Sequence, residues 1–139
     1  MIVVPLVLSN KKEAPVLQKA DLAGVETFTF NRGEFYESHL VMDELQENQI
    51  DLIVLAGFMW LIPENLVRVY SDRIVNVHPA LLPKFGGKGM YGMNVHRAVK
   101  EAGETETGIT IHLVNEEYDK GRILFQARCA VKEKDSPEM

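Results

Sequence analysis

The most informative segment of this chain is Ile74-Val75-Asn76-Val77-His78-Pro79-Ala80-Leu81-Leu82-Pro83-Lys84. It begins as an apolar run typical of a buried strand, and its two prolines and the glycines that follow predict a loop. Asn76 and His78 are two residues apart, so in a strand their side chains share one face, about 6–7 Å apart along the backbone. An amide donor and an imidazole at the end of an α/β sheet strand suit oxyanion stabilisation and proton transfer.

Outward from this stretch, strand and helix patterns alternate along the chain. Strands are predicted at residues 3–8, 25–30, 51–56, 74–77, 108–114 and 122–131, and helices at 14–23, 34–47, 63–70 and 93–102. This alternation indicates an α/β fold with a mostly parallel sheet, whose last two strands are antiparallel. No repeat, low-complexity tract or linker interrupts the pattern, so a single domain over residues 1–139 is expected.

Composition narrows the classes of function. The net charge of −5 over 139 residues argues against a nucleic-acid-binding surface, which needs clustered Lys and Arg. Cys129 is the only cysteine, which excludes an internal disulfide and fits the reducing cytoplasm. The apolar start at residues 1–8 is too short to span a membrane and lacks the features of a signal peptide. We therefore expect a cytoplasmic protein without nucleic-acid or membrane partners.

Several polar residues are candidates for chemistry. No His-x-His, His-Glu-x-x-His or paired-cysteine spacing occurs, so a metal site is not expected. His112 alternates with apolar neighbours in a predicted strand, and a buried structural histidine is its ordinary interpretation. Asp119 precedes the Gly121 turn, where turn chemistry alone explains an aspartate. Its functional interest depends on His78, because a nearby carboxylate favours the protonated imidazole.

Four segments together resemble phosphoribosylglycinamide formyltransferase, a folate-dependent enzyme family of purine synthesis. They are Leu52–Met59 (LIVLAGFM), Asn76–Lys84 (NVHPALLPK), Gly108–His112 (GITIH) and Asp119–Gly121 (DKG). The resemblance implies a doubly wound, Rossmann-like formyltransferase fold. It also implies transfer of a formyl group from 10-formyltetrahydrofolate to the amine of glycinamide ribonucleotide, without a metal.

The same resemblance assigns roles residue by residue. Asn76, His78 and Asp119 match the catalytic trio, in which Asn76 and His78 bind the oxyanion and Asp119 assists proton transfer. The folate-binding residues that it implies are Met59, Trp60, Leu61, Ile62, Asn76, Glu116, Glu117, Tyr118 and Asp119. Trp60 stands where many members of the family carry Arg, a change that a contact through the backbone should tolerate.

The chain also departs from the family pattern at both ends. The first strand-loop-helix unit, which binds the ribonucleotide phosphate in the family, and the closing helix have no counterpart, so a truncated form is expected. A folate-binding fragment without turnover is therefore an alternative. Methionyl-tRNA formyltransferase and formyltetrahydrofolate deformylase are rivals within the superfamily. Exposed sheet edges favour association, and a homodimer is left open.

Overall fold

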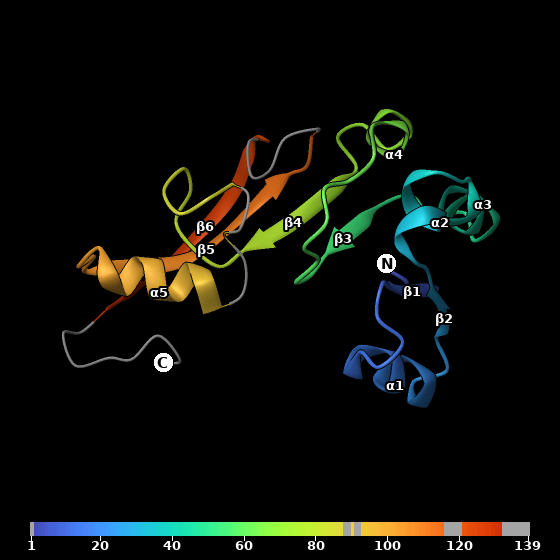
Figure 1. The fold of residues 1–139 in the computed structure, drawn as a ribbon, viewed down its shortest axis with the longest axis horizontal. Coiled ribbons are helices and arrows are strands. Elements are labelled where there is room, and N and C mark those ends of the chain that lie inside the picture. The colour runs from blue at the N-terminus through green and yellow to red at the C-terminus, as the bar shows by residue number, and fades with distance from the viewer. Residues whose placement is uncertain (1, 88–89, 91–92, 116–120, 132–139) are drawn as a thin grey trace. The chain divides into compact units, whose positions relative to one another are not determined.

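Strands and helices alternate along the chain, as the sequence predicts. The computed structural model describes residues 2–87, 90, 93–115 and 121–131 (Figure 1). The helices are α1 (Pro15–Leu22), α2 (Arg32–Tyr36), α3 (Leu40–Glu47), α4 (Glu64–Val69) and α5 (Met93–Glu101). The strands are β1 (Leu6–Ser9), β2 (Glu26–Thr29), β3 (Ile53–Leu55), β4 (Ile74–His78), β5 (Glu106–Leu113) and β6 (Ile123–Ala130).

The chain divides into two compact units, residues 1–51 and residues 52–139. The first unit holds β1, α1, β2, α2 and α3, and the second unit holds the remaining elements. The single domain expected over residues 1–139 stays a prediction.

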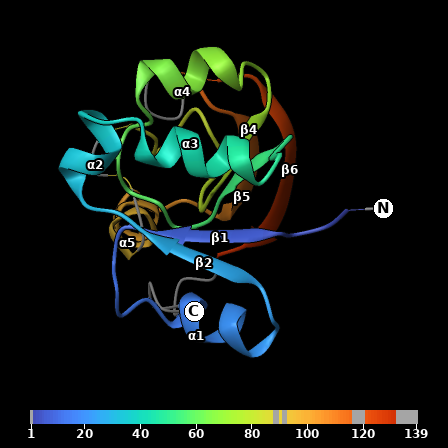
Figure 2. The same cartoon turned by 90° about the vertical axis from the view of Figure 1, so that its right-hand side faces the viewer.

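The first unit is built on two parallel strands with helices on both sides (Figure 2). β1 pairs with β2 from Leu6↔Glu26 to Ser9↔Thr29, and α1 forms the crossover between them. Pro15 lies at the start of α1, where its missing N–H has no helical partner to lose. Gly24 follows the helix with a φ of +74°, a left-handed conformation that glycine adopts without strain. Local sequence signals therefore set both ends of α1.

Two predicted boundaries in the first unit are wrong. The first strand begins at Leu6 rather than at residue 3, because β2 offers only four paired residues and Pro5 has no N–H to donate. The single helix predicted over residues 34–47 is two helices, α2 and α3. Ser38 Oγ donates to the Glu34 carbonyl at 2.7 Å and accepts from the Leu40 N–H at 3.3 Å. These local bonds compete with the helical backbone pattern at the break.

The second unit contains a four-stranded sheet in the order β3-β4-β5-β6 (Figure 1). β3 is parallel to β4, from Ile53↔Ile74 to Leu55↔Asn76. β4 is antiparallel to β5, and β5 is antiparallel to β6. The predicted antiparallel pairing of the last two strands is confirmed, and the reversal already begins at β5. The parallel β3–β4 pair brings the chain segments that follow both strands to one edge of the sheet.

A core cluster lies where α5 meets the loop that follows β4. It consists of the buried Ala80, Val95 and Val99, with Phe85, Met90 and Val131 packed against it. Ala80 is two residues beyond His78, so the loop leaving β4 is anchored in apolar packing from its start. This anchoring limits how far His78 can move relative to the sheet.

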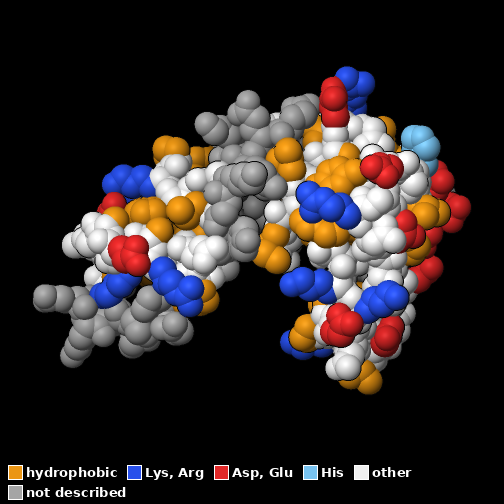
Figure 3. Space-filling model, viewed as in Figure 1, with side chains coloured by type: hydrophobic (Ala, Val, Ile, Leu, Met, Phe, Trp, Pro, Cys, Tyr) orange, Lys and Arg blue, Asp and Glu red, His pale blue; other side chains and the backbone are white. Residues whose placement is uncertain are grey.

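The surface mixes both signs of charge. On the face drawn in Figure 3, Lys and Arg side chains of the described residues are interspersed with Asp and Glu in both units. Within the described ranges, no helix is long and apolar enough to cross a membrane.

Candidate functional site

Four polar side chains share one face of the sheet at the β4–β5 pair. The register places Asn76 opposite His112 and His78 opposite Thr110. Residues directly opposite each other in an antiparallel pair point to the same face, as do residues two apart in one strand. His78, Thr110 and His112 each have an exposed fraction of 2% or less. The shared face of Asn76 and His78, which their spacing predicts, is therefore present, and β5 adds two buried polar residues to it.

Asn76 and His112 form a hydrogen bond across these strands. Asn76 Nδ2 lies 3.2 Å from His112 Nε2, and His112 Nδ1 lies 2.9 Å from the carbonyl oxygen of Leu113. A carbonyl oxygen only accepts, so Nδ1 carries the proton and Nε2 of the neutral ring is an acceptor. Asn76 therefore donates one amide N–H to His112. This bond fixes which end of the Asn76 amide faces β5.

His78 is tied to the loop that follows it. Its Nε2 lies 2.7 Å from the carbonyl oxygen of Phe85, so Nε2–H donates to this carbonyl. Phe85 itself has a φ of +58°, a left-handed conformation that is uncommon for a residue with a side chain. The orientation of His78 therefore depends on the path of the loop from residue 79 to residue 85.

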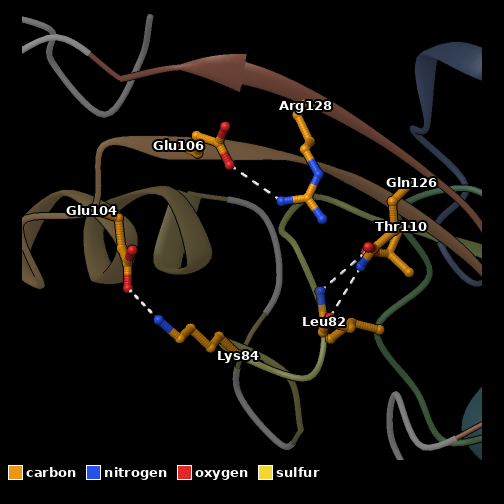
Figure 4. A network of polar contacts seen from close by, with 7 residues as sticks. All are labelled: Leu82, Lys84, Glu104, Glu106, Thr110, Gln126 and Arg128. Atoms are coloured by element: carbon orange, nitrogen blue, oxygen red, sulfur yellow. Dashed lines mark hydrogen bonds and ion pairs between the residues drawn. The ribbon is translucent and has the colours of Figure 1, made fainter.

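Thr110 links the same loop to β5 and β6 (Figure 4). Its hydroxyl donates to the Ala80 carbonyl at 2.7 Å and accepts from the Leu82 N–H at 3.1 Å. The Gln126 side-chain amide on β6 donates to the Thr110 hydroxyl and to the Leu82 carbonyl, at 3.0 Å in each case. Sequence reasoning missed both residues. Thr110 could have been identified because it lies two residues before His112 and therefore shares its face of the strand. Nothing in the local sequence indicates a role for Gln126.

The predicted folate-contacting segment, Met59–Ile62, lies between β3 and α4. It follows the carboxyl end of β3, whose last residue Leu55 pairs with Asn76 of β4. Ile62 is buried, and the Trp60 ring packs edge-on against Phe58 with centroids 5.9 Å apart. The segment therefore leaves the sheet from the same edge at which β4 ends, which is where α/β sheets bind ligands.

The predicted residues Glu116, Glu117, Tyr118 and Asp119 lie outside the described residues. Gly121, which follows them, packs tightly against β5: a Cβ added there would lie 1.6 Å from the Leu113 carbonyl oxygen. The Leu113 N–H donates to the Arg122 carbonyl at 2.8 Å. Gly121 and Arg122, which lead into β6, are therefore held against the end of β5, next to His112.

A separate cavity of about 280 Å³ lies beside the Thr110 network. Leu82 and Gln126 line it, together with two ion pairs, Lys84–Glu104 at 2.9 Å and Arg128–Glu106 at 3.2 Å. None of the described residues predicted for the site lines this cavity. Among the described residues, no group of three or more His, Cys, Asp or Glu side chains could hold a metal ion. The polar row on β4 and β5 is therefore the stronger candidate for chemistry.

A family model described as formyl transferase matches residues 2–139. The chain belongs to the formyl transferase family. Within this family it is 45% identical to "Phosphoribosylglycinamide formyltransferase, chloroplastic" of Arabidopsis thaliana, over 97% of this chain and 48% of that relative. It is 39% identical to the phosphoribosylglycinamide formyltransferase of Haemophilus influenzae, over 95% of this chain and 62% of that relative. The chain therefore spans about half to three-fifths of the length of these relatives.

Solved structures of this family share the fold. The phosphoribosylglycinamide formyltransferase of Anaplasma phagocytophilum superposes with a TM-score of 0.87 at 37% identity, covering 98% of this chain and 64% of that one. A formyltetrahydrofolate deformylase from Pseudomonas syringae gives a TM-score of 0.82 at 26% identity, covering 97% of this chain and 44% of that one. The predicted formyltransferase-type α/β fold and the resemblance to phosphoribosylglycinamide formyltransferase are both confirmed.

Proposed function

We propose that this protein transfers a formyl group from 10-formyltetrahydrofolate to the amine of glycinamide ribonucleotide, a step of purine biosynthesis. The observation that carries the proposal is the pair formed by Asn76 and His78 on one face of β4, held by partners on β5 and in the following loop. Membership of the formyl transferase family, and relatives named for this reaction, support it. The pair supplies the two kinds of group that formyl transfer requires, hydrogen-bond donors and a titratable ring.

In the proposed reaction the substrate amine attacks the formyl carbon and the formyl oxygen becomes an oxyanion. Asn76 already donates one amide N–H to His112, and its second N–H would donate to this oxygen. A protonated His78 would provide a second, charge-assisted donor. Donors that are fixed before the reaction stabilise the transition state without reorganising during it. The bonds of Asn76 to His112 and of His78 to Phe85 would supply that fixation.

Collapse of the tetrahedral intermediate breaks the bond between the formyl carbon and N10 of the folate. One proton must leave the attacking amine and one must arrive at N10, so the transfer is balanced without an additional reactant. We assign Asp119 to this proton transfer, through an intervening water, and to holding His78 protonated.

The folate would lie against Met59–Ile62, and we assign Glu116, Glu117, Tyr118 and Asp119 to further contacts with it. Apolar walls with fixed backbone donors and acceptors suit a flat ring system such as a pterin. The half-buried Met59, Trp60 and Leu61 beside the buried Ile62 support such a wall. The cytoplasmic location stays a prediction, since the Arabidopsis relative is named as chloroplastic.

A formyl-transfer assay tests the proposal. Purified protein is mixed with 10-formyltetrahydrofolate and glycinamide ribonucleotide, and formylated ribonucleotide is measured by mass spectrometry. His78→Ala should lower the rate by about 10²–10³, the scale of losing an oxyanion donor. His39→Ala is the matched control, because His39 is an exposed residue before α3 with no side-chain capping bond. A His78→Ala variant within threefold of the unchanged protein would contradict the proposal.

The same assay separates the rival functions. Release of formate that does not depend on glycinamide ribonucleotide would favour a deformylase, the activity named for the Pseudomonas syringae structure. Binding of tetrahydrofolate without either product would favour a folate-binding module. Either result would replace the proposed transferase activity.

A further inference from the structure

The hydroxyl of Thr110 has all of its hydrogen-bonding capacity in use. It donates its one proton to the Ala80 carbonyl and accepts two hydrogen bonds, from the Leu82 N–H and from Gln126 Nε2. Gln126 Nε2 also has two protons and two acceptors, the Thr110 hydroxyl and the Leu82 carbonyl. Figure 4 shows the Thr110 and Gln126 side chains converging on the backbone of Leu82. We call these contacts the Thr110–Gln126 clamp.

The clamp holds the loop between His78 and Phe85, the two residues whose hydrogen bond sets the orientation of the imidazole. Ala80 lies two residues after His78, and Phe85, whose carbonyl accepts from His78 Nε2, lies three residues after Leu82. Thr110, Ala80 and Leu82 are buried, so water has little access to these bonds. Breaking the clamp would release the backbone between His78 and its acceptor at Phe85. The imidazole would then lose its single orientation. Thr110 lies directly opposite His78 in the β4–β5 register, so a change at Gln126 on β6 separates the effect of the clamp from the effect of a direct neighbour.

We propose that Thr110 and Gln126 are positioning residues for His78. They hold residues 80–82 against β5 and β6, so that the Phe85 carbonyl stays within bonding distance of Nε2. The expected effect on catalysis rests on the proposed formyl transfer. The effect of the clamp on the orientation of His78 can be measured without any turnover. It assigns a function to Gln126, which lies 44 residues from Leu82 in sequence.

The test uses isosteric variants of the intact protein. Thr110→Val keeps the shape of the side chain and removes the hydroxyl, whereas Thr110→Ser keeps all three hydrogen bonds. Gln126→Glu places an oxygen where the donating Nε2 stood, facing two oxygen atoms. Gln18→Glu is the matched control for the charge change, because Gln18 is exposed on α1.

Two nuclear magnetic resonance signals report the clamp directly. We expect the Leu82 amide proton, which is donated to Thr110, to exchange with solvent at least tenfold faster in Thr110→Val and Gln126→Glu. The His78 Nε2 proton, observable because Phe85 holds it, should broaden or vanish in the same two variants. Both signals should persist in Thr110→Ser and Gln18→Glu. Unchanged signals in Gln126→Glu would overturn the inference. Because Gln126 is only half-buried, its variant still tests the clamp if Thr110→Val fails to fold.

The catalytic consequence is a selective loss of kcat. In Gln126→Glu, kcat for formyl transfer should fall at least tenfold while KM for the folate changes less than threefold, because Gln126 is placed outside the folate wall. Loss of the His78 proton signal with an unchanged kcat would overturn the positioning role. If the unchanged protein makes no formylated ribonucleotide, the proposed function fails, and the two resonance signals still decide whether the clamp orients His78.

Discussion

Asn76 on β4 and His112 on β5 lie directly opposite each other, and Asn76 Nδ2 is 3.2 Å from His112 Nε2. The Leu113 carbonyl fixes the His112 tautomer, and the tautomer in turn fixes the Asn76 amide. A histidine whose ordinary interpretation from sequence is structural therefore sets the direction of a proposed oxyanion donor. This arrangement makes His112 a sensitive position for both stability and activity.

Replacing His112 should affect both properties. His112→Leu removes the acceptor of the half-buried Asn76 N–H and should lower the free energy of unfolding by about 0.5–1.5 kcal/mol, the net contribution of one hydrogen bond. The rate of formyl transfer should fall about 10–10²-fold as the amide loses its fixed direction. Urea denaturation and the formyl-transfer assay provide the measurements. His39→Leu at an exposed position serves as control, with an expected change within about 0.5 kcal/mol.

Trp60 should matter more for stability than for folate affinity. Its ring packs on Phe58 at 5.9 Å, so Trp60→Ala should cost about 0.5–1.5 kcal/mol beyond the area lost, and Trp60→Phe should retain much of this contact. The proposed contact to the pterin runs through the backbone, so the dissociation constant of tetrahydrofolate should change less than threefold. Isothermal titration calorimetry measures it. A tenfold weaker affinity, equivalent to about 1.4 kcal/mol, would show that the side chain itself binds the ligand.

Gly121 should tolerate no side chain. A Cβ there would lie 1.6 Å from the Leu113 carbonyl oxygen, and backbone atoms cannot yield as a flexible side chain can. Gly121→Ala should lower the free energy of unfolding by about 1–3 kcal/mol, as overpacking does, and reduce formyl transfer by displacing the chain next to Asp119. Gly33→Ala is the matched control, because its nearest contact is 3.5 Å away. Equal thermal stability of the two variants would contradict this account.

The start of α2 depends on a reciprocal cap. Asn31 Oδ1 accepts from the Glu34 N–H at 2.8 Å, and the Glu34 carboxylate accepts from the Asn31 N–H at 2.9 Å. Asn31→Ala should therefore destabilise the protein by about 1 kcal/mol. Asn65→Ala, at an exposed position in the first turn of α4, should change the free energy of unfolding by less than about 0.5 kcal/mol. Chemical denaturation of both variants checks the difference, which should vanish if the cap contributes nothing.

Features that depend on neighbours along the chain could be predicted from the amino-acid sequence. The alternation of strand and helix patterns, the limits of α1 at Pro15 and Gly24, and the shared face of Asn76 and His78 follow from proline, glycine and the period of two. The segments that resemble phosphoribosylglycinamide formyltransferase also placed the chain in its family. The break between α2 and α3 also depends on local bonds, from Ser38 to Glu34 and Leu40, but the continuous helical pattern over residues 34–47 does not reveal it.

The residues that hold Asn76, His78 and the following loop in place come together through tertiary contacts. Asn76 and His112 are 36 residues apart, Thr110 and Leu82 are 28 apart, and Gln126 and Leu82 are 44 apart. Their contacts depend on the register of β4, β5 and β6, and a shift of one residue would turn each side chain to the opposite face. Register is set by packing and pairing across the whole sheet, which no local pattern encodes. For this reason the sequence predicted Asn76 and His78, whereas the side chains that hold them in place emerged only from the assembled strands.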